Sequence, residues 1–269
     1  MKTYEYIKAE ITDSIAIVTL NNPKKTNAIN EAMWGEIKLV FDEVSENNDV
    51  KACIVKSDAK HFSSGIDVGF LGSIMERLEN LPADQRGSEL YKQIKKMQES
   101  MNAIQDCRVP VIAAVHGICV GGAVDLIGAC DIRLSTYSAV YSIMETKLGI
   151  VADMGTLQRL TRIVSDTHLK EYALTSDFFS GFKAKKINLV NKNYLTKAQL
   201  HKAALKLAHK LADLPSNAVC GTKETINFAR DNSITDGLDQ IAKLNSNLLL
   251  SEETRNALAK VMNKLKKKS

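Results

Sequence analysis

Several signals that would assign this chain to a common protein class are missing from its sequence. Its five cysteines are scattered, without a CxxC pair or a His/Cys cluster, which indicates buried free thiols in a reducing compartment and no metal site. No apolar run reaches the ~18 residues of a membrane-spanning helix. The opening stretch MKTYEYIKAEITDS lacks the apolar core of a signal peptide, and the final KKS is not a peroxisomal address. We therefore expect a cytoplasmic protein with no membrane part.

Motifs of two large enzyme classes are absent as well. The glycine-rich stretches contain neither a Walker loop ending in GKS or GKT nor a Rossmann GxGxxG pattern. No serine–histidine–acid grouping is evident, which disfavours covalent hydrolysis. The reaction, if there is one, must come from other side chains.

The composition is that of an ordinary globular protein. The 269 residues are 45% apolar and 25% charged, enough for one large domain or for a domain with a smaller appendage. The net charge is 36 − 31 = +5, and the end of the chain, KLKKK at 264–268, supplies four of the positive charges. A solvated helix end explains this cluster better than a nucleic-acid site does, so nucleic acid is not an expected partner.

Strand-like and helix-like segments alternate along the first part of the chain and then give way to helices only. Up to about residue 195, short apolar runs alternate with helical periodicity, and from there to the end no strand signal remains. This order predicts an α/β fold, with a core over residues 1–195 and a helical region over 196–269. The main expected elements are a hairpin formed by Tyr4–Ile11 and Ile15–Leu20, a helix capped by Asn30 that runs to Ser45, a strand over Ala52–Val55, a mostly helical flap over Phe70–Asp106 that is interrupted at Asn80–Gly87, and a strand over Leu189–Tyr194.

Three acids stand among apolar residues in the stretch from Val111 to Leu160. They are Asp125, Glu145 and Asp153. A carboxylate in an apolar setting costs several kcal/mol unless it is paired or kept neutral. The stretch therefore holds either a network of ion pairs or a set of acids and bases with shifted pKa values.

The ion-pair interpretation has specific candidates. Asp125 could pair with Arg133, and Glu145 could pair with Lys147 or Arg159. Asp153 could instead cap the helix expected near Thr156, because Asp is a favoured N-cap residue. A further pair, Asp131 with Arg133, is expected beside the core.

Two glycine loops could supply backbone N–H groups to a ligand. Ser63–Asp67 follows a buried strand, and Gly117–Gly122 precedes the apolar segment Ala123–Cys130. Packing alone would explain either loop, but a glycine pair that opens a helix also exposes N–H groups at the positive end of the helix dipole. If the two loops converge, they could bind the oxygen of a thioester, and a nearby carboxylate could then move a proton at its α-carbon. His61 and His116 flank these loops and are expected to support them rather than to act as bases.

At this point several motifs, in the correct order, resemble the enoyl-CoA hydratase/isomerase (crotonase) superfamily over nearly the whole chain. They are VTLNNPKKTNAIN, HFSSGIDV, PVIAAVHGICVGGAVDLIGACDIR and GIVADMGTLQRL. The resemblance implies a spiral of ββα units with a helical trimerisation region, assembled as homotrimers or hexamers. It also implies an acyl-CoA substrate whose carbonyl meets the N–H groups of Ile66 and Gly122, with no metal and no cofactor beyond the coenzyme A of the substrate.

Within this superfamily, the three acids are similar to those of Δ3,5-Δ2,4-dienoyl-CoA isomerases. That resemblance implies a proton transfer at C2 by Glu145, one at C6 by Asp153, and electrostatic support from Asp125, with the first two roles open to exchange. An enoyl-CoA hydratase or a Δ3,Δ2-enoyl-CoA isomerase is the alternative, although Asp153 has no evident use in a simple hydratase.

The resemblance gives less detail on the rest of the site. It implies contacts between coenzyme A and Lys24, Lys25 and Lys60, which lie in loops near the expected nucleotide site. Residues near Phe70–Met101 would set the acyl chain length. The chain also departs from the family pattern, because it has INLV at 187–190 where relatives often have a Gly-Leu-Val turn.

Overall fold

The computed structural model describes residues 1–266, and its scaffold is a pair of β-sheets. The larger sheet has the order β1-β2-β3-β4-β6-β9, in which only the β1–β2 pair is antiparallel. Its strands are β1 (Ile7–Thr12), β2 (Ile15–Leu20), β3 (Ala52–Ser57), β4 (Val111–Val115), β6 (Ile132–Thr136) and β9 (Lys192–Tyr194). The smaller sheet joins β5 (Ile118–Val120), β7 (Val140–Ser142) and β8 (Phe179–Ser180). The predicted α/β class is confirmed.

The chain passes from the larger sheet to the smaller one twice. β4 leads to β5, then α4 (Gly122–Ala129) returns the chain to β6, and β6 leads to β7. A parallel bridge between Ser63 and Cys119 brings the loop after β3 to the edge of the smaller sheet in the same way. This repeated strand–strand–helix order places the loops after β3 and β5 side by side.

The elements expected near the N-terminus are confirmed. The hairpin turns at Asp13 and Ser14, which both have positive φ angles, as in the tight turns that match strand twist. α1 (Glu31–Glu46) begins where predicted, with the Asn30 side chain accepting a hydrogen bond from the Met33 N–H. Its buried face packs against the first strands and α3.

Two helices pack against different sides of this scaffold. α4 is buried along its whole length, among α3 (Ala83–Asp106), α5 (Thr156–Leu160) and β5. On the other face of the larger sheet, α8 (Lys197–Ala212) packs Leu200 and Ala204 against the sheet residues Ile54 and Ile112.

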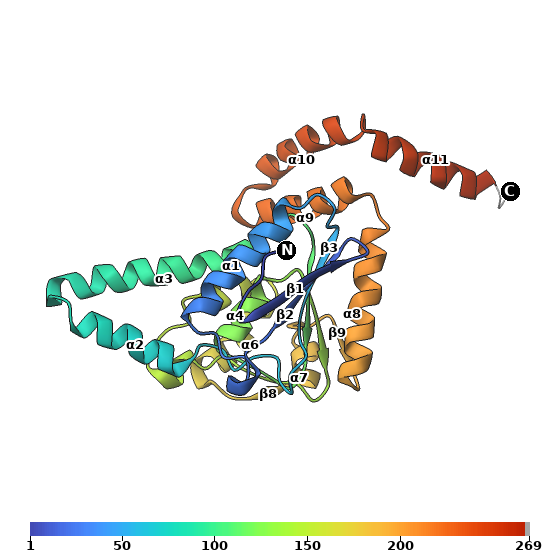
Figure 1. Ribbon diagram of the computed structural model, residues 1–269. Coiled ribbons are helices and arrows are strands. Elements are labelled where there is room, and N and C mark those ends of the chain that lie inside the picture. The colour runs from blue at the N-terminus through green and yellow to red at the C-terminus, as the bar shows by residue number, and fades with distance from the viewer. Residues whose placement is uncertain (267–269) are drawn as a thin grey trace.

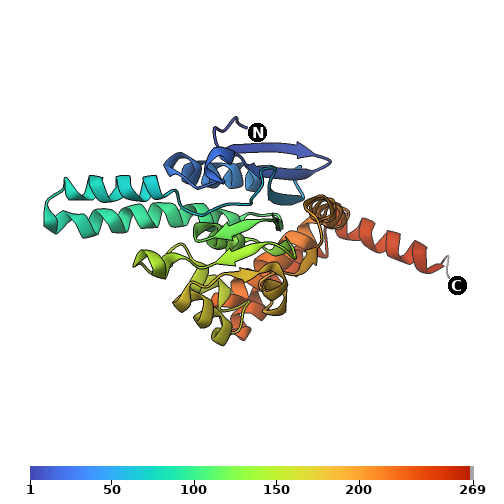
Figure 2. The same ribbon diagram turned by 90° about the horizontal axis from the view of Figure 1, so that it is seen from below.

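The expected flap is a hairpin of two helices that extends from the body (Figures 1 and 2). α2 (Val68–Glu79) and α3 are joined by Asn80-Leu81-Pro82, a shorter interruption than predicted. The outer part of α3 is exposed, whereas its last turns bury Met97, Met101 and Ile104. One end of α3 is therefore fixed to the core.

Several short elements around β7 and β9 differ from the prediction. The structure adds the 3-10 helix η2 (Glu145–Leu148) and α7 (Gly181–Lys186), and β9 begins at Lys192 rather than at Leu189. The helix that the sequence predicts over His168–Leu174 is present as α6 (Asp166–Thr175). At the departure from the family pattern, Asn188 has a φ of 67°. Asn is one of the few residues besides glycine that tolerate this conformation, so the turn is kept without glycine.

The strand β9 ends at Tyr194, and the only regular elements in the described residues after 195 are helices, as predicted. α9 (Ser216–Asp231), α10 (Ile234–Leu248) and α11 (Glu252–Lys266) follow α8, and α10 and α11 project beyond the body (Figure 1). Of the lysine-rich end, Lys267 and Lys268 lie outside the described residues. Among the described residues, no helix combines the length and the apolar character needed to cross a bilayer.

Candidate active site

The N–H groups of Ile66 and Gly122 lie next to each other, as the sequence predicted. In the parallel bridge between Ile29 and Ile66, the Ile29 N–H donates to the Gly65 carbonyl and the Asp67 N–H donates to the Ile29 carbonyl. That pattern leaves the Ile66 N–H free and directed away from Ile29. Gly122 is the first residue of α4, so its N–H has no acceptor within the helix. A Cβ on Gly122 would stand 3.4 Å from the Ile66 nitrogen.

Gly65 permits this close approach. Its φ is +81°, and a Cβ at this position would lie 2.4 Å from the Val120 carbonyl oxygen and 2.9 Å from the Gly122 nitrogen. Only glycine fits such a backbone contact and tolerates this φ. Within the described residues, neither the Ile66 N–H nor the Gly122 N–H donates to another group. The two together form a candidate oxyanion hole.

Asp125 lies in the first turn of α4 and is almost completely buried. Its Oδ1 accepts a hydrogen bond from the Thr156 backbone N–H at 2.7 Å. Burial raises the pKa of this carboxyl to about 6; the Thr156 hydrogen bond opposes the shift, and the charge of Asp153 adds to it. Asp125 is thus a buried acid whose charge is partly neutralised by a helix N-terminus.

This contact overturns two of the predicted alternatives. Asp125 does not pair with Arg133, whose Nε donates to the Leu189 carbonyl at 2.7 Å. Asp153 does not cap the helix near Thr156, because Gly155 occupies the N-cap position and Asp125 reaches the helix from α4. The sequence suggested a local cap, whereas the fold supplies a distant one.

Glu145 follows β7 at the start of η2 and is 9% exposed. A Cβ on Gly121 would lie 3.6 Å from its Oε1, so the carboxyl group is close to the start of α4. Its Oε2 is buried without a hydrogen-bond partner among the described residues. Burial raises the pKa of Glu145 to about 7, and the charges of Asp125 and Asp153 add to the shift. Glu145 therefore exchanges a proton near neutral pH.

The predicted ion pairs of Glu145 are also wrong. Lys147 points its Nζ to the Ser176 carbonyl, 3.0 Å away. Arg159 donates to Gln105, to Asn102 and to the Met154 carbonyl, all of them uncharged acceptors. Within residues 1–266, no cation forms an ion pair with Glu145.

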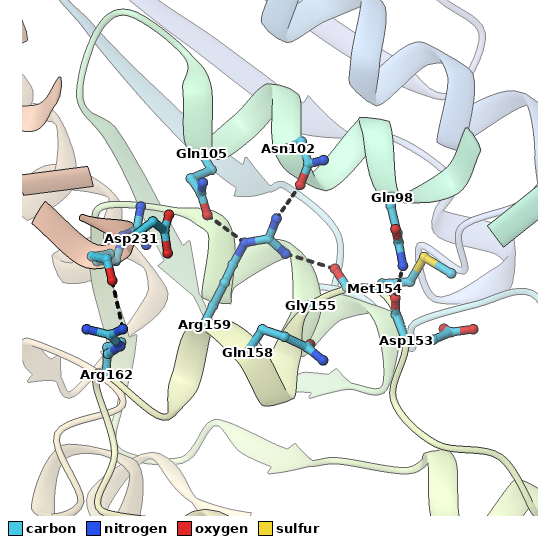
Figure 3. Close-up of a pocket in the computed structure, with 11 residues that line it drawn as sticks. Gln98, Asn102, Gln105, Asp153, Met154, Gly155, Gln158, Arg159, Arg162 and Asp231 are labelled. Carbon is cyan, nitrogen blue, oxygen red and sulfur yellow. Dashed lines mark hydrogen bonds between the residues drawn. The ribbon is translucent and has the colours of Figure 1, made fainter. Parts of the chain in front are cut away.

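Asp153 is half-buried in the loop before α5, and burial raises the pKa of its carboxyl. Its backbone carbonyl accepts a hydrogen bond of 2.7 Å from Nε2 of Gln98 (Figure 3). The charge of Asp153 contributes to the raised pKa of both Asp125 and Glu145, so the three acids share one electrostatic environment. In the part of the chain that the structure describes, none of the three forms an ion pair. The arrangement is that of tuned acids and bases rather than of a salt-bridge network.

A different acid in the same stretch is paired. Asp131, just beyond the end of α4, accepts from Lys223 Nζ at 2.7 Å and from the Val111 N–H at 2.7 Å. The pair predicted between Asp131 and Arg133 is therefore wrong. The true partner comes from α9, which is distant in the sequence.

The three lysines assigned to coenzyme A lie at the surface and are not equivalent. Lys25 forms an ion pair with Asp67 at 2.7 Å, and this contact is the main cause that lowers the pKa of Asp67. Asp67 in turn caps α2 by accepting from the Gly69 N–H. Lys24 and Lys60 are exposed. Coenzyme A binding by these lysines stays a prediction.

Both histidines support the glycine loops. The Nδ1 of His61 accepts from the Ile118 N–H at 3.2 Å, and the Nε2 of His116 lies 2.9 Å from the Ala59 carbonyl oxygen. Burial lowers the pKa of His116. These contacts agree with the structural role predicted for the two side chains.

The structure adds residues that the sequence interpretation left out. Next to Asp153 is a cavity of about 390 Å³, and Gln98, Asn102 and Gln105 of α3 line it together with Arg159 (Figure 3). The three α3 side chains are spaced by four and three residues, which places them on one helix face. That spacing was visible in the sequence, but nothing local indicated that this part of the flap faces the acids.

Comparison with known proteins gives a consistent result. The family model described as "Enoyl-CoA hydratase/isomerase" matches residues 10–268. A protein from Arabidopsis thaliana named "Delta(3,5)-Delta(2,4)-dienoyl-CoA isomerase, peroxisomal" is 40% identical over 98% of this chain and 96% of its own length. One from Dictyostelium discoideum with the same name, but "mitochondrial", is 35% identical over 93% of this chain and 86% of its own length.

Solved structures agree on the fold. An enoyl-CoA hydratase from Bacillus anthracis superposes with a TM-score of 0.87 and covers 97% of both chains, at 23% identity. At that identity the likeness concerns the fold, and it confirms the crotonase-type architecture. Together, the matched motifs, the geometry around Gly65 and these relatives show that the chain belongs to the enoyl-CoA hydratase/isomerase family.

Proposed function

We propose that this protein is a Δ3,5-Δ2,4-dienoyl-CoA isomerase of fatty acid β-oxidation. It converts a 3,5-dienoyl-CoA into the 2,4-dienoyl-CoA by moving protons between carboxylates and the acyl chain. The observation that carries the proposal is the presence of a third unpaired acid, Asp153, beside Asp125 and Glu145. Relatives of 35% and 40% identity that carry this enzyme name support the same reaction.

The proposed reaction needs no group beyond the protein and the substrate. Glu145, as the carboxylate, removes a proton from C2, and the electron pair moves onto the thioester oxygen to form an enolate. The N–H groups of Ile66 and Gly122 stabilise that negative charge. Protonated Asp153 delivers its proton to C6 as the double bonds shift, so the proton count is unchanged. The opposite order of Glu145 and Asp153 satisfies the same balance.

The raised pKa values suit these tasks. A general base with a pKa of about 7 is present in both protonation states at neutral pH, which allows it to take and return protons. Burial also keeps part of the Asp153 population protonated at a higher pH than usual, as a donor to carbon requires. Asp125 supports Glu145 electrostatically, because its charge raises the pKa of that residue.

Binding and assembly are part of the proposal. Lys24, Lys25 and Lys60 contact the coenzyme A part of the substrate, and no metal or separate cofactor takes part. The chain assembles as a homotrimer or as a hexamer of two trimers through its helical C-terminal region. Supporting this, α10 buries no residue and exposes Ile234 and Leu238, and α11 exposes Val261. A cytoplasmic location stays a prediction, since the two relatives above are named as peroxisomal and mitochondrial.

The test is a spectroscopic assay of the purified protein with two substrates in parallel. One is a 3,5-dienoyl-CoA and the other a 2-enoyl-CoA, and absorbance of the conjugated thioester is followed in each. We expect rapid growth of the 2,4-dienoyl signal, and loss of that activity in Glu145→Gln and Asp153→Asn. Glu171→Gln, which alters an exposed glutamate of α6 in the same way, is the matched control and should keep full activity.

Two results would contradict the proposal. Rapid loss of the 2-enoyl signal with an unreactive diene would identify a hydratase instead. Diene isomerisation that persists in Asp153→Asn would remove the residue on which the assignment depends.

A further inference from the structure

The loop that carries Asp153 is held by Asp125 and by two side chains that the proposed chemistry does not use, Gln98 and Arg159. Hydrogen bonds hold three consecutive peptide groups of this loop. The Asp153 carbonyl accepts from Gln98, the Met154 carbonyl accepts from Arg159, and the Thr156 N–H donates to Asp125. Each of these bonds measures 2.7 or 2.8 Å. A loop with so many fixed groups has little freedom to move its acid.

Arg159 joins this loop to α3. Its Nε donates to Gln105 at 2.9 Å, its Nη2 to Asn102 at 2.6 Å and its Nη1 to the Met154 carbonyl at 2.8 Å (Figure 3). One planar guanidinium thus spans two side chains of a helix and one carbonyl of the loop. A lysine in its place could not make these bonds together, because it has a single nitrogen.

The backbone at Gly155 lies in close contact with the same side chain. Its φ is +112°, and a Cβ would lie 1.8 Å from the Nη1 atom of Arg159. The backbone therefore passes directly over the guanidinium, at a position where a larger residue would displace Arg159. The fit between Gly155 and Arg159 fixes the loop from a second direction.

Arg159 is also a half-buried cation without an ionic partner among the described residues. Burial lowers its pKa, and the negative charge of Asp125 opposes that shift. A guanidinium gains most from a carboxylate partner when its main task is to offset charge. Arg159 instead has neutral acceptors, so its bonds position a backbone rather than neutralise a charge.

We propose that Arg159 and Gln98 are positioning residues that set the place of Asp153 relative to Glu145 through the backbone of residues 153–155. This inference rests on the proposed isomerase function. A misplacement of about 1 Å of a reacting group can reduce a rate about 100-fold. We call Arg159 and Gln98 together the clamp. Substitutions in the clamp should therefore lower turnover much more than substrate binding.

The experiment compares Arg159→Lys and Gln98→Leu with the wild-type protein. Steady-state kinetics with a 3,5-dienoyl-CoA should show a 10- to 100-fold decrease in kcat in each variant, in line with the ~100-fold effect of a small misplacement, and a KM that changes less than about 2-fold. The control is Arg162→Lys, which alters an exposed arginine that donates to the Arg230 carbonyl rather than to the Asp153 loop. Its kcat should equal that of the wild-type protein.

A second measurement reads the position of the loop without activity. Amide hydrogen exchange should become faster over residues 152–156 in both variants and remain unchanged elsewhere in the larger sheet. Wild-type kcat in both variants would overturn the inference, and so would unchanged exchange over residues 152–156 or equally faster exchange throughout the protein. If wild-type protein does not isomerise dienes, the proposed function fails, while the exchange experiment still tests the clamp.

Discussion

The charged side chains at the two ends of α4 differ in whether they have a partner of opposite charge. Near its first turn, Asp125 and Glu145 form no ion pair in the part of the chain that the structure describes, and burial raises the pKa values of both. Just beyond its last turn, Asp131 is paired with Lys223 at 2.7 Å, and the nearby Arg133 is surrounded by carbonyl oxygens. The same short helix thus separates two kinds of charged site. We call the side with Asp125 and Glu145, which lack an ion pair, the uncompensated end, and the side with Asp131 and Lys223 the compensated end.

This difference indicates which charges serve the structure and which serve chemistry. A charge that only stabilises the fold gains from a partner, and the pair at Asp131 has one. An acid that must take and release a proton near neutral pH needs a raised pKa, which an adjacent cation would lower. Under the proposed function, the lack of ion pairs at the three acids among the described residues serves the chemistry and costs stability.

The largest effect is expected from removing an acid at the uncompensated end. Glu145→Gln and Asp153→Asn should each lower kcat by about 10²- to 10⁴-fold, because each removes a proton carrier. Stopped-flow or steady-state absorbance with a 3,5-dienoyl-CoA measures the loss. A decrease of less than about 10-fold in either variant would show that the residue is not a proton carrier.

The next largest effect should follow from blocking the backbone N–H pair. Gly65→Ala places a Cβ against the Val120 carbonyl and the Gly122 nitrogen, at a φ of +81°. We expect kcat to fall by about 10²- to 10³-fold, as for the loss of an oxyanion-hole donor. Gly72→Ala, where a Cβ meets nothing within 4 Å, is the control and should be fully active. Equal activity in both variants would exclude the oxyanion hole.

At the compensated end, a substitution should lower stability and leave activity almost unchanged. Asp131→Asn leaves the nearly buried Lys223 without its ionic partner and should lower the free energy of unfolding by about 1–3 kcal/mol. Its kcat should stay within about 2-fold of the wild-type value at a temperature where it is folded. Denaturant unfolding and the diene assay on one preparation test both parts, and a large loss of kcat would remove the contrast between the two ends.

The contribution of Glu145 to the stability of the protein should depend on pH. The pKa of Glu145 is raised in the folded state, so ionising it disfavours folding as the pH rises from about 4.5 to about 7. Glu145→Gln removes this cost, and its Tm relative to wild type should therefore increase over that window. A constant difference in Tm between the two proteins across the window would contradict the shift.

The smallest effect concerns the pH dependence of activity. With Glu145 as the base, kcat/KM should rise with pH through about 7 as this residue loses its proton. Asp125→Asn removes one negative charge that raises the pKa of Glu145, so the rise should move to lower pH. A shift to higher pH, or none, would show that Asp125 does not act on Glu145.

Most of the fold could be predicted from the sequence because its signals are local. The apolar spacing of α1 and the N-cap residue Asn30 specify that helix without reference to the rest of the chain. β5 was missed because its three residues lie inside a glycine-rich loop, where strand geometry comes from pairing with β7.

The candidate site was predicted unevenly for the same reason. Glu145, Asp125 and Gly122 stand out as acids or glycines in an apolar stretch, and the structure brings them together. Their partners were mostly wrong, since a hydrogen bond from Thr156 or an ion pair from Lys223 depends on which distant segments meet. Residue type predicts a role, whereas only the fold selects the contact.

The central claim is that Glu145 holds its proton near neutral pH because its carboxyl group is buried and forms no ion pair among the described residues. Difference infrared spectroscopy of wild-type protein against Glu145→Gln isolates the carboxylic acid band of this residue during a pH titration. We expect the band to disappear with a midpoint near 7. A midpoint near the ordinary value of 4.5 would contradict it and would mean that a partner stabilises the charge after all.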